Sequence, residues 1–505
     1  MNIQNLSQYA LLAQASYAYL ENFKDKNGDY KESIVQDALI DVDRGSFASN
    51  QAENFVKNYE VISHQPNTSS GFSATILRNK ESNENIFSIR GTELSSLGVV
   101  INDGAADFGD IGFDGIAIEQ AIDLFNYLQR LTAVKGQKVL QLSHSKITVE
   151  DDEHITYQEG IFFDKIITAE ENGVLANQMF SIVGHSLGGH LAMILSRLAG
   201  DFVTQTITVN APGFDTEIVP GFDNAETFFT EVRILMQEYG FSDSQIKAQY
   251  NTDNMTHLVT ESNLANDVIS KIGTVPGEQT PVYVEIGSAL AGDLTAHSSV
   301  LLSDALALQA VFSKLDRSFD LTQAYQIFQA SGLPESQMLD ALRFIILGDS
   351  VAKTKADDRE NFYKNLYELE KAIDEIPSKD SMYFQITNST IAAQNTAEGF
   401  AHRYALAKLN AFALVIGADY SHDTSGELDL YDTATGEITE NWLNDRNQLL
   451  IVKSVLDKHD LSYQHVGDHS YGGYNDYLKG YPEMRQFIGK NIKMMDTSSG
   501  LSVEL

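Results

Sequence analysis

The feature that most constrains this chain is the stretch 179–198, MFSIVGHSLGGHLAMILSRL. A short apolar run leads into Gly184-His185-Ser186-Leu187-Gly188 and then directly into a helical pattern of apolar residues. A G-x-S-x-G match arises by chance about 0.2 times in a chain of this length, so the pattern alone decides nothing. Strand, sharp turn and helix, however, are the setting in which this pattern holds a nucleophilic serine. We therefore predict that Ser186 is a nucleophile.

A nucleophilic serine needs a base and a carboxylate that orients the base. After such a turn the partners are expected in the chain order Ser, Asp or Glu, His. His297 follows the strand-like VYVEIG and precedes an apolar helix; the alternative is a surface histidine at a helix start. Asp267 follows the strand-like HLVT and is the candidate acid, whereas Asp215 and Asp253 remain alternatives as turn or capping residues.

The negative charge that develops on an attacked carbonyl oxygen requires hydrogen-bond donors. The backbone N–H of Leu187, which follows the nucleophile, is the first candidate. Thr92, at the end of the strand-like IFSIRGTE, is the second because both its N–H and its hydroxyl could point inward.

The chain as a whole is too long for a single core. From about 70 to 300, strand-like and helix-like segments alternate, which predicts an α/β fold with a central, mostly parallel sheet. The stretch 134–176 is polar and weakly periodic, and is interpreted as an insertion. Helical patterns dominate after about 310. We therefore expect a catalytic domain over 1–310 and a helical or mixed C-terminal region over 311–505.

Composition excludes several classes of function. With 35 Lys and Arg against 70 Asp and Glu, the net charge is −35, which argues against nucleic acid as a partner. The absence of cysteine removes disulfides, thiolate metal sites and a cysteine nucleophile. The sequence contains no run of 18 consecutive apolar residues, so it predicts no transmembrane segment. The first 20 residues lack Lys and Arg, so we expect a buried helix there rather than a secretory signal.

The segments IFSIRGTE, GHSLGGHLA, TVNAPGF and NLANDVI, followed by the histidine of AHSS, occur in this order between about 70 and 310. In this combination the chain resembles the class 3 lipase family. The resemblance implies an α/β-hydrolase fold with Ser186, Asp267 and His297 as the triad. It also implies an oxyanion hole formed by Thr92 and Leu187, and a lid over about 93–115.

The stretches ALLAQASYAYL, AEGFAHRYALAKLNAFAL and LYDTATGEITENWLNDRNQLL are similar to bacterial lipases and phospholipases A1 exported by type I systems, although the calcium-binding nonapeptide repeats of those proteins are missing here. The resemblance implies secretion without an N-terminal signal; a cytoplasmic location is the alternative. No cofactor is expected. Calcium is left open without a clear motif, since DKNGD at 25–29 fails the EF-hand spacing. His465, Asp468 and His469 are interpreted as a polar loop rather than a metal site.

The hypothesis drawn from the sequence is a serine hydrolase that cleaves carboxylic esters of lipids, either as a triacylglycerol lipase or as a phospholipase A1. Its partners would be a lipid or ester substrate and, transiently, a lipid interface. The alternatives are a soluble carboxylesterase acting on small esters and a catalytically silent hydrolase fold used for binding. The region after 310 could also act as a delivery or partner-binding module.

Overall fold

A computed structural model describes most of the chain up to residue 416. The described residues are 1–20, 30–91, 116–150, 155–214, 225–264, 266–286, 295–348, 350–377, 381–416, short pieces between 443 and 454, 493–497 and 500–504. All structural statements below refer to these residues.

The centre of the molecule is a sheet of seven strands in the order β1-β2-β3-β6-β7-β8-β9. The strands are β1 Tyr59–Gln65, β2 Ala74–Asn79, β3 Asn85–Ile89, β6 Phe180–His185, β7 Val203–Val209, β8 Met255–Ser262 and β9 Gln279–Val284. The pairs from β3 to β9 are parallel, and β1 and β2 extend the sheet in antiparallel fashion. The predicted α/β fold with a mostly parallel sheet is therefore confirmed.

Both faces of the sheet are buried, as parallel sheets require. Successive side chains of a strand point to opposite faces. Ile182 and Val183 accordingly belong to two different hydrophobic clusters, and both are fully buried. This explains why the strand before Ser186 is a continuous apolar run rather than an alternating one.

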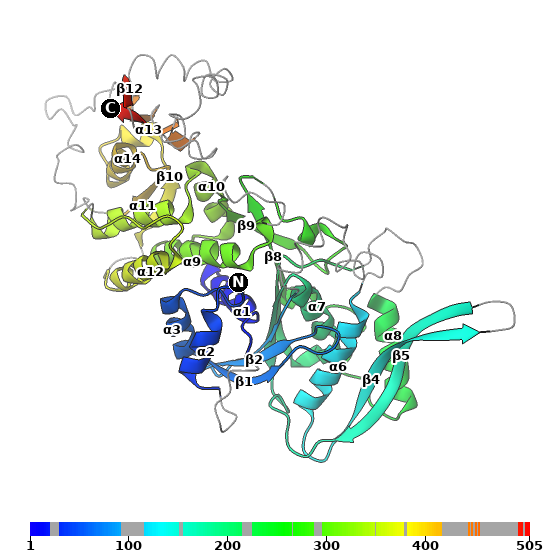
Figure 1. The fold of residues 1–505 in the computed structure, drawn as a ribbon. Helices are drawn as coiled ribbons and strands as arrows, with labels where there is room; N and C mark the ends of the chain where they lie inside the picture. The colour runs from blue at the N-terminus through cyan, green and yellow to red at the C-terminus, as the bar shows by residue number, and fades with distance from the viewer. Residues whose placement is uncertain are drawn as a thin grey trace.

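Helices cover the two faces (Figure 1). On the first, α1 (Ile3–Ala15) packs on α9 (Ser299–Leu315), with α2 (Glu32–Leu39) and α3 (Ser49–Asn58) beside them. The other face carries α6 (Ile118–Thr132) and α7 (Leu187–Ala199), and α8 (Ala225–Glu238) joins the same hydrophobic cluster. The expected buried N-terminal helix is present. None of the described helices is both long and apolar enough to cross a membrane.

The insertion expected at 134–176 is a long antiparallel hairpin, β4 (Lys138–Glu150) and β5 (Ile155–Thr168), which projects from the body in Figure 1. At the base of this hairpin Leu140 and Leu142 are buried in the same hydrophobic cluster as α6 and α7. Phe163 stacks there on Tyr239 beyond the end of α8, with 4.2 Å between the ring centroids. The stretch is polar and weakly periodic, so no alternation of apolar residues predicted a hairpin there.

Among the described residues after α9, helices dominate, as the sequence predicts. They are α10 Leu321–Ser331, α11 Glu335–Leu347, α12 Arg359–Asp374, α13 Ser389–Ala392 and α14 Ala397–Lys408, with the short strand pairs β10 Tyr383–Ile386 with β11 Phe412–Val415 and β12 Lys493–Thr497 with β13 Gly500–Glu504. One hydrophobic cluster extends from Ile3 to Val415. Residue 310, the expected domain boundary, lies inside α9, and the division into domains stays a prediction.

Candidate active site

The nucleophile candidate lies at a sharp turn between strand and helix. Strand β6 ends at His185 and α7 begins at Leu187, so Ser186 alone makes the turn, with φ 55° and ψ −130°. A non-glycine residue in this region is strained and requires support from its surroundings. Its backbone N–H donates to the carbonyl oxygen of Val209 on the neighbouring strand β7 at 2.9 Å. The turn is thus anchored to the sheet.

The flanking glycines are required by close backbone approach. A Cβ on Gly184 would lie 2.1 Å from the carbonyl oxygen of Gly188, and a Cβ on Gly188 would lie 2.3 Å from the carbonyl oxygen of Ile89. Real Cβ atoms do not approach that closely, and backbone atoms cannot move away cheaply. The pattern G-x-S-x-G is therefore a packing requirement of this turn.

The structure brings Ser186, His297 and Asp267 together although they are widely separated in the chain. The Oγ of Ser186 lies 2.8 Å from Nε2 of His297, and Nδ1 of His297 lies 2.9 Å from Oδ1 of Asp267. Asp267 follows β8, and His297 ends a short 3₁₀ turn, Thr295–His297, beyond β9. All three side chains thus lie beyond the carboxyl ends of parallel strands, where α/β sheets bind ligands.

The protonation pattern follows from the carboxylate. Burial opposes its charge, but hydrogen bonds from His297 and Ser270 outweigh that effect and hold the pKa of Asp267 below its usual value. The ionised carboxylate accepts from Nδ1–H of His297 and, through Oδ2, from the backbone N–H of Ser270 at 2.7 Å. In the neutral imidazole with its proton on Nδ1, Nε2 is the acceptor for the hydroxyl proton of Ser186. This is the arrangement in which the imidazole can act as a general base.

Three further residues support the triad and were not singled out from the sequence. His185 donates from Nε2 to the backbone carbonyl of His297 at 2.7 Å, and the hydroxyl of Tyr17 donates to Nδ1 of His185 at 2.7 Å. Asn210 donates to the carbonyl of Ala296 at 3.2 Å. His185 and Asn210 lie within GHSLG and TVNAPGF, so those motifs were the available signal. Tyr17 lies within ALLAQASYAYL, a stretch noted for its resemblance but not for a role at the site.

Of the two predicted oxyanion donors, only Leu187 lies among the described residues. Its N–H belongs to the first turn of α7, where backbone donors have no partner within the helix, and the helix dipole favours negative charge there. Thr92, the lid predicted over 93–115 and the alternative acid Asp215 lie outside the described residues. Asp253, the other alternative, lies in the exposed 3₁₀ turn Thr252–Asn254 and not at the triad.

A pocket of about 210 Å³ lies beside the triad. Its lining includes Tyr17 and His185 together with Arg44, Ser298 and Val300. It is lined by His185 and Ser298, the chain neighbours of Ser186 and His297, but not by Ser186 or His297 themselves.

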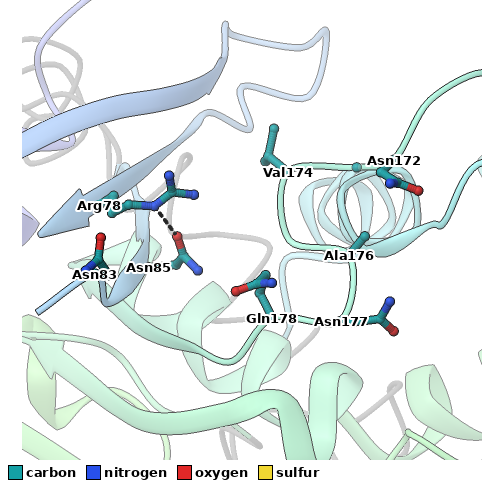
Figure 2. A pocket seen from close by; sticks show the side chains of 9 residues that line it. Arg78, Asn83, Asn85, Asn172, Val174, Ala176, Asn177 and Gln178 are labelled. Atoms are coloured by element: carbon teal, nitrogen blue, oxygen red, sulfur yellow. Dashed lines mark hydrogen bonds between the residues drawn. The ribbon is translucent and has the colours of Figure 1, made fainter. Parts of the chain in front are cut away.

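The larger pocket, of about 400 Å³, lies at the opposite end of the strands (Figure 2). Arg78 donates there to Asn85 at 3.0 Å, and the segment from Asn172 to Gln178 forms the facing wall. Its lining consists mostly of amide side chains and contains neither a histidine nor a carboxylate. The hydrogen-bonded residues Ser186, His297 and Asp267 are not part of this pocket.

Metal binding finds no support in the described part of the chain, where no three His, Asp or Glu side chains are placed to hold an ion. The segments 25–29 and 465–469 lie outside the described residues. The absence of a cofactor and the question of calcium thus stay predictions.

Comparisons with known proteins add little to this geometry. No protein-family model matches the chain, and no curated protein matches it. Among solved structures, the chain is similar to the crystal structure of the Lip2 lipase from Yarrowia lipolytica, with 15% identity and a TM-score of 0.23. The match covers 55% of this chain and 78% of that one. A similarity this weak carries no argument about function, and the family resemblance stays a prediction.

Proposed function

We propose that this protein is a serine hydrolase with an α/β-hydrolase fold that cleaves carboxylic esters of lipids. The observation that carries the proposal is the continuous hydrogen-bonded chain from Ser186 through His297 to Asp267, with the serine in a strained turn between strand and helix. Strand order, turn and side-chain geometry meet here in the way that nucleophilic catalysis by serine needs.

In the proposed reaction, Ser186 Oγ attacks the ester carbonyl while Nε2 of His297 takes its proton. Asp267 holds the imidazole in the required tautomer and stabilises the imidazolium that forms. The N–H of Leu187 would donate to the developing oxyanion, and Thr92 is proposed as the second donor. Losing one such donor typically costs about 3 kcal/mol of transition-state stabilisation. His297 then protonates the leaving alcohol, and water cleaves the acyl-enzyme by the same steps in reverse.

The lipid substrate is suggested by burial. Ser186 and His297 are each only 1% exposed, so a substrate reaches the hydroxyl only after a neighbouring segment moves. Movement of a covering segment at a lipid interface would meet that need. Because the net charge of −35 opposes anionic surfaces, we propose docking through an apolar patch on neutral lipid. Membership of the class 3 lipases and secretion without an N-terminal signal belong to the same proposal.

Acyl release by the wild type and by Ser186→Ala tests the proposal. The substrates are a short soluble ester below and above its solubility limit, a long-chain triglyceride emulsion, and phospholipid labelled separately at each acyl position. Ser196→Ala is the matched control, because Ser196 lies on α7 and donates only to the carbonyl of Met193. We expect cleavage by the wild type and by Ser196→Ala, and none by Ser186→Ala.

The outcomes separate the alternatives. A jump in rate above the solubility limit supports a lipase, and release from one phospholipid position supports a phospholipase A1. Cleavage of the soluble ester alone, without a jump, would indicate a carboxylesterase. A folded wild type that neither cleaves any substrate nor reacts with a phosphonate ester would overturn the proposal in favour of a silent binding fold.

A further inference from the structure

We propose that His185, held by Tyr17, is a positioning residue that keeps the imidazole of His297 aligned with Ser186. This inference rests on the proposed function for its catalytic consequence, but its structural part can be tested separately. His185 directly precedes the nucleophile at the end of β6 and is buried. Its side chain reaches across to the backbone of the residue that carries the base.

The directions of the two hydrogen bonds follow from their partners. A backbone carbonyl only accepts, so the 2.7 Å contact between Nε2 of His185 and the carbonyl oxygen of His297 places the proton on Nε2. A neutral imidazole then has a bare Nδ1, and the hydroxyl of Tyr17, 2.7 Å away, must donate to it. Tyr17 thereby selects the one tautomer of His185 that can hold the His297 carbonyl.

His185 also has to stay uncharged beside a group that becomes cationic. Its ring centroid lies 4.8 Å from that of His297, and a second imidazolium at that distance would oppose proton uptake by the base. Burial, together with the neighbouring His297, lowers the pKa of His185 to about 3. The imidazole of His185 therefore stays neutral over the pH range in which the proposed reaction runs.

The 3₁₀ turn that carries His297 is held at two successive carbonyls. His185 binds the carbonyl oxygen of His297, and Asn210 binds that of Ala296 at 3.2 Å. Asn210 also accepts from the backbone N–H of Thr260 on β8 at 2.8 Å, which ties Asn210 to the sheet. With both carbonyls fixed, the side chain of His297 has little freedom to leave its position between serine and aspartate.

Tyr17 brings the N-terminal segment into this arrangement. It lies just after α1, and its hydroxyl packs against the end of β3: a Cβ on Gly91 would lie 2.6 Å from the Tyr17 oxygen and 3.1 Å from Cβ of Ser186. The hydroxyl thus lies beside Ser186, although Tyr17 belongs to the segment after α1 and not to the sheet. A displacement of the segment after α1 would therefore break the hydrogen bond between Tyr17 and His185.

Two substitutions of His185 separate the hydrogen bond to His297 from packing in general. In His185→Gln the amide nitrogen can reach the position of Nε2 and still donate to the His297 carbonyl. In His185→Asn the shorter amide can replace Nδ1 toward Tyr17 but leaves that carbonyl without its donor. Tyr17→Phe removes only the hydroxyl that selects the tautomer.

His190→Asn is the matched control. His190 is also buried, its pKa is lowered to about 4 by burial, and it lies in the first turn of α7. Its Nδ1 hydrogen-bonds the carbonyl oxygen of Gly213 at 3.1 Å, and its ring packs on Phe214, so this histidine ties α7 to the segment after β7 without touching the triad.

The first readout needs no substrate: the downfield proton NMR signal of the hydrogen bond between His297 and Asp267, assigned by its loss in Asp267→Ala. The second is kcat and KM on the ester that the wild type cleaves best. For His185→Asn we expect a shifted or broadened signal and a kcat about 10- to 100-fold lower with KM nearly unchanged, because small misplacements of a base are costly. Tyr17→Phe should lower kcat about three- to tenfold. His185→Gln should retain both the NMR signal and the kcat of the wild type.

The proposal is overturned if His185→Asn keeps the wild-type signal and kcat, if His185→Gln is impaired as severely as His185→Asn, or if His190→Asn shows the same change of signal. A folded wild type without ester hydrolysis would refute the proposed function alone, because the NMR comparison would still decide whether His185 positions His297.

Discussion

Replacing Asp267 by Asn tests the protonation pattern of the triad with a change of nearly constant shape. The carboxylate accepts from three donors: Nδ1 of His297 at 2.9 Å, the backbone N–H of Ser270 at 2.7 Å and that of Ile269 at 3.3 Å. Asn retains one acceptor oxygen, so its NH₂ group must face either the imidazole or the backbone of Ser270. The shorter backbone contact favours the oxygen facing Ser270, which leaves the NH₂ facing His297.

This orientation determines the size of the effect. An NH₂ group donates, so Nδ1 of His297 would have to accept and the proton would move to Nε2. Nε2–H would then point at Ser186 and could not take the hydroxyl proton. Loss of the correct tautomer lowers kcat by a factor on the order of 10⁴, which corresponds to about 5.5 kcal/mol at about 1.36 kcal/mol per tenfold. A purely geometric loosening would cost only about 100-fold.

The assay is kcat on a soluble ester, with the fraction of folded enzyme taken from the unfolding transition of each variant. KM should change little, because the carboxylate touches no substrate. Asp253→Asn is the control, since this exposed residue was the rival acid in the sequence and should leave kcat unchanged. A folded Asp267→Asn with less than a tenfold loss, or with a loss confined to KM, would refute the reasoning.

Three further predictions concern stability and packing. Burial, together with nearby carboxylates, raises the pKa of Glu335 to about 8. Between about pH 4.5 and pH 8 the folded chain therefore keeps a proton that the unfolded chain loses. The stabilising contribution present below about pH 4.5 is lost as the pH rises toward 8. The free energy of unfolding of Glu335→Gln should equal that of the wild type at pH 4 and exceed it by about 1–2 kcal/mol at pH 8. The difference is this small because the side chain is only partly shielded from solvent. A difference that does not vary with pH in denaturant titrations would contradict this prediction. In Gly188→Ala the Cβ would meet the carbonyl oxygen of Ile89, so we expect a cost of about 1–3 kcal/mol and a loss of phosphonate reactivity; full reactivity would show that the turn tolerates the methyl group. Phe312→Ala, which removes a fully buried ring in contact with four other phenylalanines, should cost about 3–5 kcal/mol in one cooperative transition; a separate early transition would indicate that the C-terminal helices unfold independently.

The sequence was most informative where local pattern and burial agree. The apolar run before Ser186 is a strand buried on both faces, and the strand-like HLVT lies within β8. It was least informative for β4 and β5, whose pairing is long and antiparallel although no alternating period marks it in the sequence.

What the sequence by itself determined is the candidate nucleophile and the turn that holds it, because a strand, a glycine pair forced by backbone contact and a helix are adjacent in the chain. The order of the motifs also selected Asp267 and His297 among several acids and histidines. Only the tertiary structure decided that these side chains meet, since the parallel sheet brings the ends of β6, β8 and β9 to one edge. The same holds for Tyr17, whose role depends on a contact across 168 positions of the chain that no local pattern encodes.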